Sequence, residues 1–240
     1  VSNGDFSQEG SELITNGGFS TDSDWSKGTG WSISGGKAVA VSGASTRLEQ
    51  SISGLIGKTC KVSFTLSDYG GGGAVYVDFG SVNSDLINTN GIHTVYGTFD
   101  QDNFELFKGA AFSGSITNIS VKEVGQNWDF GTSWSISDGV AYFDDIANGS
   151  IKQNITFVSG KKYRASFEIK SGSSSIGLYS SDGVTNYSPF TPYGVGTHSV
   201  EFDYTTGSGF GIYASKFLGG AFSITNISVI EITTDTNLPR

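Results

Sequence analysis

Hydrophobic and polar residues alternate along most of this chain in short runs, a pattern typical of β-strands with one buried face. The run 61–67 places Val62, Phe64 and Leu66 on one side, and the run 74–80 alternates in the same way. Glycine-rich segments separate the runs and provide the tight turns that link antiparallel strands. The pattern therefore predicts an all-β protein.

The composition supports this fold class and excludes several kinds of protein. The 240 residues include 35 glycines and only 3 prolines, which suits short strands joined by turns. A formal charge of −9 argues against nucleic acid as a partner, because phosphate binding needs clustered Lys and Arg. The sequence contains no apolar run approaching the roughly 20 residues of a membrane-spanning helix, so no membrane insertion is predicted. The single cysteine, Cys60, is interpreted as a small apolar residue in a strand.

A self-comparison shows that the chain contains related sequence twice. The segment WSISGG from Trp31 matches WSISDG from Trp134, at an offset of 103 residues. GKTCKVSF from Gly57 lies over GKKYRASF from Gly160 at the same offset. The identical ITNISV segments, the first of which begins at Ile116, are 108 residues apart, which indicates short insertions in turns.

The repeat predicts two copies of one domain of about 110 residues, an ordinary size for a β-sandwich. The first copy is expected over residues 12–124 and the second over residues 125–232. Residues 1–11 contain NGDFS, an echo of NGGFS in the first copy, and are expected to be an entry segment or the remnant of a preceding copy. Residues 233–240 are polar, contain a proline and are interpreted as a linker to a downstream region.

Three stretches of the first copy carry a family resemblance: ELITNGGFSTDSDWSKGTGWSISGGKA, LEQSISGLIGKTCKVSFTL and ITNISVKEV. They resemble the carbohydrate-binding modules of families four and nine, which are galactose-binding-like jelly-roll sandwiches. The resemblance implies two tandem antiparallel β-sandwich domains of that kind. More narrowly, GSELITNGGFSTDSDWSKGTGWSI, SVKEVGQNWDFGTSWSI and TTDTNLPR resemble tandem modules of bacteriophage tail-fibre and appendage proteins. This implies a place on a virion surface or outside the cell, with glycans and other virion proteins as partners.

The chain departs from the family pattern at positions linked to a structural calcium ion. Ser20 stands where the family often has Glu, and Asn118 and Asn226 stand where Asp is usual. Calcium prefers carboxylate oxygens among its ligands. No metal or other cofactor is therefore predicted.

The aromatic and histidine residues allow both structural and functional interpretations. Trp25, Trp31, Trp128 and Trp134 are expected in the cores, because large aromatic residues favour burial and two of them share parity with an isoleucine. His93 and His198 occupy matching positions before a strand and are expected to hydrogen-bond the backbone. No nucleophile, base and orienting group recur together, so the chain is predicted to be non-catalytic.

The outward positions of the strands combine aromatic rings with carboxylates. The hypothesis is that they form one glycan-binding surface per copy, with rings stacking on sugars and carboxylates accepting hydroxyl hydrogen bonds. The residues are Tyr76, Asp78, Tyr96, Glu105 and Phe107 in the first copy, and Tyr179, Glu201, Asp203 and Tyr213 in the second. Two weak modules in series would gain avidity. The alternative is that both copies are structural spacers whose outer faces contact other protein chains.

Overall fold

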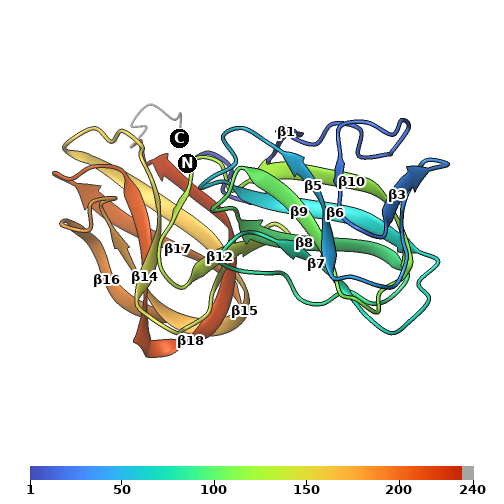
Figure 1. Cartoon of the computed structure of the whole chain (residues 1–240). Coiled ribbons are helices and arrows are strands. Elements are labelled where there is room, and N and C mark those ends of the chain that lie inside the picture. The colour runs from blue at the N-terminus through green and yellow to red at the C-terminus, as the bar shows by residue number, and fades with distance from the viewer. Residues whose placement is uncertain (234–240) are drawn as a thin grey trace, which may run out of the picture. The chain divides into compact units, whose positions relative to one another are not determined.

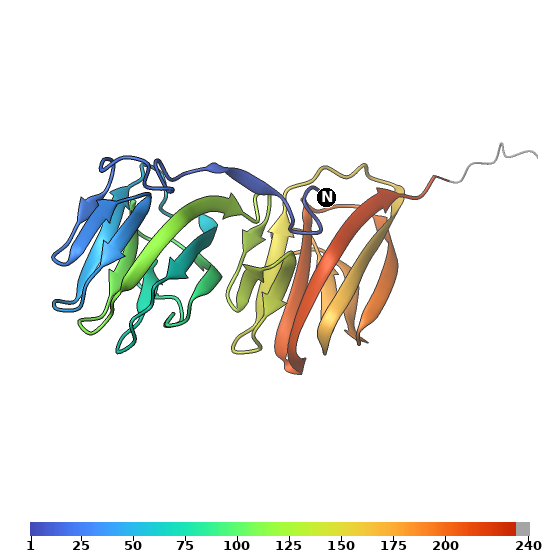
Figure 2. The same cartoon turned by 90° about the vertical axis from the view of Figure 1, so that its right-hand side faces the viewer.

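The computed structural model describes residues 1–233, and all regular structure within them is β. The chain divides into two compact units. Glu9–Val124 form the first, here called the N-unit, and Val1–Gln8 together with the chain from Gly125 onward form the C-unit. Each unit consists of antiparallel strands, and the predicted fold class, two antiparallel β-sandwiches, is confirmed (Figures 1 and 2).

Two sheets make up the N-unit. The first sheet has the order β3-β4-β10-β6-β8, with β1 also paired to β10, and the second has the order β2-β5-β9-β7. The strands of the first sheet are β1 (Glu9–Glu12), β3 (Trp31–Ser34), β4 (Lys37–Ala40), β6 (Thr59–Ser67), β8 (Gly91–Thr98) and β10 (Gly114–Val124). Those of the second sheet are β2 (Ser26–Lys27), β5 (Thr46–Ser51), β7 (Val75–Asp78) and β9 (Asn103–Lys108).

The hydrophobic core of the N-unit lies between its two sheets, because the alternating strands turn their apolar residues to one side. Val62 and Phe64 of β6 are buried in the same cluster as Val77 of β7 and Leu106 of β9. The outer faces of both sheets are left to polar and half-buried residues, as β6 and β7 illustrate with strict alternation. Any ligand surface built on strands must therefore use one of two outer faces.

The C-unit repeats this arrangement with longer strands. Its strands are β11 (Asp129–Phe130), β12 (Trp134–Ser137), β13 (Val140–Phe143), β14 (Gly149–Gln153), β15 (Lys161–Tyr179), β16 (Asn186–Tyr193), β17 (Gly196–Tyr204) and β18 (Phe210–Glu231). Strand β15 pairs with β17 over residues 161–169 and with β16 over residues 174–179, and β18 is divided in the same way. The eight strands are hydrogen-bonded into one continuous sheet, which runs through β15 and β18. The half that contains β12, β13 and β17 is here called the first sheet of the C-unit, and the half that contains β11, β14 and β16 is called its second sheet.

The two ends of the chain differ from the sequence expectation in detail. Residues 1–8 do not form a separate entry segment, because they pack within the C-unit. Residues 9–12 form β1 and pair with β10 in the N-unit. The predicted linker, residues 233–240, lies outside the described residues except for Thr233.

All four tryptophans are buried, as the sequence predicted. Their exposed fractions are 7% for Trp25, Trp31 and Trp134 and 8% for Trp128. The rings pack among other aromatic residues, so their role is to fill the cores rather than to offer an open stacking surface.

The two histidines contact the backbone and the cysteine lies in a strand, as predicted, but His93 and His198 lie inside β8 and β17 rather than before them. Nε2 of His93 lies 2.7 Å from the carbonyl oxygen of Thr89, and Nε2 of His198 lies 2.7 Å from that of Gly194. Each imidazole therefore ties the start of a strand to the preceding turn. Cys60 is fully buried on β6.

Candidate functional site

The structure divides the predicted ligand residues of the N-unit between two outer faces. Tyr76 and Asp78 on β7 and Glu105 and Phe107 on β9 share the outer face of the second sheet. Tyr96 belongs to β8, in the first sheet. The expectation of a single surface is therefore wrong for Tyr96, because alternation separates inside from outside but both sheets of a sandwich have an outside.

The same division occurs in the C-unit. Tyr179 on β15 and Tyr213 on β18 lie on the second sheet, whereas Glu201 and Asp203 lie on β17 in the first. Glu201 accepts hydrogen bonds from Arg164, whose Nη2 lies 2.7 Å from Oε1, and this contact lowers the pKa of Glu201. The two carboxylates are thus not available to a ligand resting on the tyrosines.

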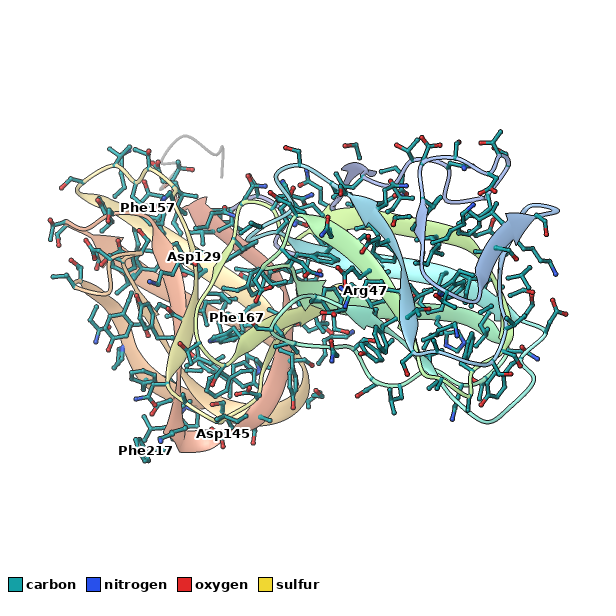
Figure 3. All side chains as sticks on the ribbon, in the orientation of Figure 1. Arg47, Asp129, Asp145, Phe157, Phe167 and Phe217 are labelled. Carbon is teal, nitrogen blue, oxygen red and sulfur yellow. The ribbon has the colours of Figure 1, made fainter. Side chains whose placement is uncertain are left out.

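The outer face of the second sheet of the N-unit, here called the N-face, is built around an aromatic pair. Tyr76 and Phe107 stack with ring centroids 5.0 Å apart and an interplanar angle of 25°. The guanidinium of Arg47, a residue of β5 that is labelled in Figure 3, lies 6.0 Å from the centroid of Phe107. Arg47 therefore contacts the ring that a ligand would need, and contributes a cation–π interaction there.

Glu105 sits beside this pair in a protected position. Although its side chain points outward, only 3% of the residue is exposed. Burial raises the pKa of Glu105, and the neighbouring Arg47 opposes this rise. Nη1 of Arg47 lies 2.7 Å from Oε2 of Glu105. The carboxylate is therefore engaged by Arg47, which leaves Asp78, its register partner, as the more open acceptor on the N-face.

The corresponding face of the C-unit, here called the C-face, carries Tyr179, Phe190, Tyr213 and Lys152. The ring centroids of Tyr179 and Tyr213 are 4.9 Å apart, and those of Tyr179 and Phe190 are 6.0 Å apart. Nδ2 of Asn186 donates a 3.2 Å hydrogen bond to the hydroxyl of Tyr179. Three neighbouring strands therefore bring together one aromatic cluster.

Glycines determine how the two tyrosine rings lie on the C-face. A Cβ built on Gly177 would lie 2.7 Å from Cε2 of Tyr179, and one built on Gly211 would lie 2.8 Å from Cε2 of Tyr213. Each ring thus leans over the glycine two residues before it in its own strand. Side chains at these glycine positions would displace the rings from the sheet, so the glycines let the rings lie along its surface.

A pocket of about 510 Å³ adjoins this aromatic cluster. Tyr213, Phe190 and Leu218 provide apolar walls, and Lys152 and Asn148 provide polar groups. The volume falls within the range of small-molecule sites, which combine apolar surface with a few polar groups.

Sequence reasoning missed four residues of this site, namely Phe190, Lys152, Leu218 and Asn148. Phe190 and Leu218 lie where the second copy is longer than the first, so the repeat gave no counterpart to compare. Lys152 follows the alternation of its strand, but a lone lysine on an outer face gave no specific signal. The only usable signal was the presence of three aromatic residues, Phe190 among them, in the segment NYSPFTPY.

The N-face and C-face carry different chemistry at matching register positions. One row across the second sheet reads Arg47–Phe107–Tyr76 in the N-unit and Ser150–Tyr213–Gly177 in the C-unit. The next row reads Glu49–Glu105–Asp78 in the N-unit and Lys152–Gly211–Tyr179 in the C-unit. The N-face is therefore rich in carboxylates with one guanidinium, and the C-face is aromatic with one ammonium. The two faces would select different ligands.

Residues 1–233 contain no group of three or more His, Cys, Asp or Glu side chains arranged to hold a metal ion. No helix long and apolar enough to cross a membrane occurs among the same residues.

Comparison with known proteins gives only distant similarities. No family model matches the chain, and no curated protein matches it. Among solved structures, the tandem CBM51 modules of Sp3GH98, the family 98 glycoside hydrolase from Streptococcus pneumoniae SP3-BS71, match at 9% identity and a TM-score of 0.24, over 79% of this chain and 84% of that one.

Two further structures are similarly distant. The M60 catalytic domain with the CBM51-1 and CBM51-2 domains from Clostridium perfringens ZmpB matches at 8% identity and a TM-score of 0.24, over 80% of this chain and 34% of that one. An anti-sigma factor domain-containing protein matches at 8% identity and a TM-score of 0.21, over 80% of this chain and 79% of that one. Identities and TM-scores this low show nothing about the function of this chain.

Proposed function

We propose that the chain is a pair of non-catalytic glycan-binding modules whose main binding site is the C-face. The observation that carries the proposal is the cluster of Tyr179, Tyr213 and Phe190 beside a pocket of about 510 Å³. An aromatic ring lying along a surface offers its face to the apolar C–H groups of a sugar. Lys152 and Asn148 would donate hydrogen bonds to hydroxyl oxygens at the polar side of the pocket.

The N-face is proposed as the weaker site of the two. Arg47 lies over Phe107 and engages Glu105, so a ligand would have to displace the guanidinium to reach the ring. A ligand contacting both units would gain affinity through the raised effective concentration of the second contact. Because the two faces differ, this gain requires a glycan that offers two different epitopes.

The biological setting is also a proposal. The resemblance of the chain to bacteriophage tail-fibre and appendage modules supports a larger virion protein, or else a secreted one, that recognises cell-surface polysaccharide. The corresponding location is the virion surface or the extracellular space. Other virion proteins are the expected neighbours.

A structural spacer is the second candidate, and one observation favours it. Phe217 is 76% exposed and the adjacent Leu218 is 47% exposed, where β18 bends between the two sheets, and the labelled Phe217 projects beyond the ribbon (Figure 3). Exposed neighbouring apolar side chains mark protein–protein contacts when they belong to a larger patch.

A glycan array probed with the whole chain distinguishes the two candidates. We expect binding that falls about tenfold or more when Tyr179→Ala and Tyr213→Ala are combined, since each aromatic contact contributes about 0.5–1.5 kcal/mol beyond area burial. Tyr142→Ala is the matched control, because Tyr142 is 39% exposed on β13 in the first sheet. A silent array, or equal loss with Tyr142→Ala, would contradict the C-face site and favour the spacer.

A further inference from the structure

A glutamine in each unit holds a short N-terminal segment by the same two hydrogen bonds. In the N-unit, Oε1 of Gln50 accepts from the backbone N–H of Thr15 at 2.8 Å, and Nε2 donates to the Thr15 carbonyl at 2.9 Å. In the C-unit, Oε1 of Gln153 accepts from the N–H of Ser2 at 2.7 Å, and Nε2 donates to the Ser2 carbonyl at 2.9 Å. Ser2 therefore occupies in the C-unit the position that Thr15 occupies in the N-unit.

The next residue along each segment is bound by a tryptophan. Nε1 of Trp25 donates to the carbonyl of Asn16 at 3.1 Å, and Nε1 of Trp128 donates to the carbonyl of Asn3 at 3.0 Å. Both asparagines have positive φ values, 54° for Asn16 and 50° for Asn3. The backbone conformation of the two segments is thus the same at the residue that the indole recognises.

A glycine then fits directly against the last strand of each unit. The carbonyl of Gly17 accepts from the N–H of Ile119 at 3.0 Å, and that of Gly4 accepts from the N–H of Ile227 at 2.9 Å. A Cβ on Gly17 would lie 2.0 Å from the carbonyl oxygen of Ile119, and one on Gly4 would lie 1.8 Å from that of Ile227. Only glycine can occupy either position at this distance.

The segment ends on a buried phenylalanine. Phe19 packs on Trp25 with ring centroids 5.2 Å apart, and Phe6 packs on Trp128 at 5.5 Å, both with an interplanar angle of 44°. Phe6 is 2% exposed, so residues 1–8 contribute a core residue to the C-unit (Figure 2, where the N-terminus is marked).

The sequence before Trp128 explains why the C-unit takes this segment from the start of the chain. Trp25 is preceded by its own NGGFS, whereas Trp128 is preceded by VKEVGQN, which contains no such motif. The N-unit begins and ends on paired strands, with Glu9 opposite Val124. The chain therefore enters and leaves the N-unit at neighbouring residues, a geometry that permits insertion of one domain into another.

We propose that the N-unit is inserted into the C-unit, and that the C-unit is a docking site for an N-G-x-F-S segment. The occupant is residues 1–8 of the same chain. The contacts that recognise it are backbone hydrogen bonds, a glycine fit and one buried ring, and none of them requires a covalent link. The site therefore accepts the same segment when it is supplied as a separate peptide.

The test compares residues 9–240 with the whole chain. Loss of Phe6 and its hydrogen bonds should lower the melting temperature of the C-unit by at least about 10 °C. Peptide-resolved hydrogen exchange should show faster exchange in residues 125–233 and unchanged exchange in the N-unit. Adding the peptide VSNGDFSQ at about 1 mM, comparable with the effective concentration of a tethered segment, should restore both measurements.

Matched variants keep the proposal falsifiable if the shortened chain folds poorly. In the whole chain, Gly4→Val should weaken only the C-unit and Gly17→Val only the N-unit. Asp5→Gly, which recreates the NGGFS of the first segment, should change neither. Unchanged stability after removal of residues 1–8, no rescue by VSNGDFSQ, or equal rescue by a peptide carrying Gly4→Val would each overturn the proposal.

Discussion

Replacing Gln50 by leucine tests whether the repeated glutamine holds its segment as the contacts indicate. Gln50 is 8% exposed on β5 and uses its amide for three hydrogen bonds. Two are with the backbone of Thr15, and in the third Nε2 donates to the carbonyl of Asp24 at 3.1 Å. Leucine keeps the approximate size of the side chain but removes every donor and acceptor.

The size of the effect follows from these contacts. A net contribution of about 1 kcal/mol per hydrogen bond gives a loss of about 3 kcal/mol for Gln50→Leu. Each 1.4 kcal/mol changes an equilibrium constant tenfold, so the population of the opened N-unit should rise about 100-fold. Gln153→Leu removes two equivalent bonds and should cost the C-unit about 2 kcal/mol.

A buried thiol can report how often the N-unit opens. Cys60 is its single cysteine, lies on β6 of the N-unit and is fully buried. Burial raises the pKa of its thiol to about 12, with Glu123 adding to the rise, so the reactive thiolate is scarce in the folded state. Labelling of Cys60 by a thiol reagent at pH 8 therefore reports opening of the N-unit.

We expect the Cys60 labelling rate to rise about 100-fold in Gln50→Leu and to stay unchanged in Gln153→Leu, since Gln153 belongs to the other unit. A rise of less than about threefold in Gln50→Leu would mean that the glutamine contributes under 1 kcal/mol. A similar rise in both variants would show that the units do not open independently. Either result would refute the reasoning.

Three further predictions concern groups in the N-unit and one counterpart in the C-unit. Lys108 is fully buried, and burial lowers its pKa. At pH values between this lowered pKa and the ordinary pKa of lysine, the free energy of unfolding of the wild type, measured by chemical denaturation, should therefore rise with pH relative to that of Lys108→Met. Arg47→Ala should cost about 1 kcal/mol at pH 7 and less as the pH falls, because burial raises the pKa of Glu105 and protonation removes the charge that pairs with Arg47; an equal cost at pH 7 and pH 4 would contradict the pairing. Asn118 and Asn226 have φ values of 54° and 53° in bulged strands, so replacement by Ala should lower the melting temperature, at about 1 kcal/mol per site, and replacement by Gly should not.

Much of the fold could be predicted from sequence because period-two alternation and the 103-residue offset report on local geometry and on duplication. Val62 and Phe64 lie in the core for this reason. The place of residues 1–8 could not be predicted, because NGDFS looks like a remnant when only its position along the chain is considered. Its partners, Gln153 and Ile227, are distant in sequence and are brought to it by the fold.

The candidate site was harder to predict than the fold. Alternation identified Tyr179, Tyr213 and Glu201 as outward, but it could not say that Glu201 lies on the other sheet. It also placed Glu105 at the surface, whereas the neighbouring side chains leave it 3% exposed. Which face a strand residue occupies depends on strand order, and how open it is depends on its neighbours; neither is encoded in a single alternating run.

Comparison of the two copies distinguishes the residues that maintain the fold from those that could determine ligand specificity. The positions that hold the N-terminal segments match closely: Gln50 and Gln153 make the same two hydrogen bonds to their segments, and Trp25 and Trp128 each donate one to the next residue. The outer faces do not match, since Glu105 stands opposite Gly211 in the alignment of the two sheets. Packing constrains the first group in any copy of this domain, whereas the faces have been free to change. WSIS, NGxFS and ITNISV are therefore marks of the scaffold, and ligand specificity should be sought where the copies diverge, first on the C-face.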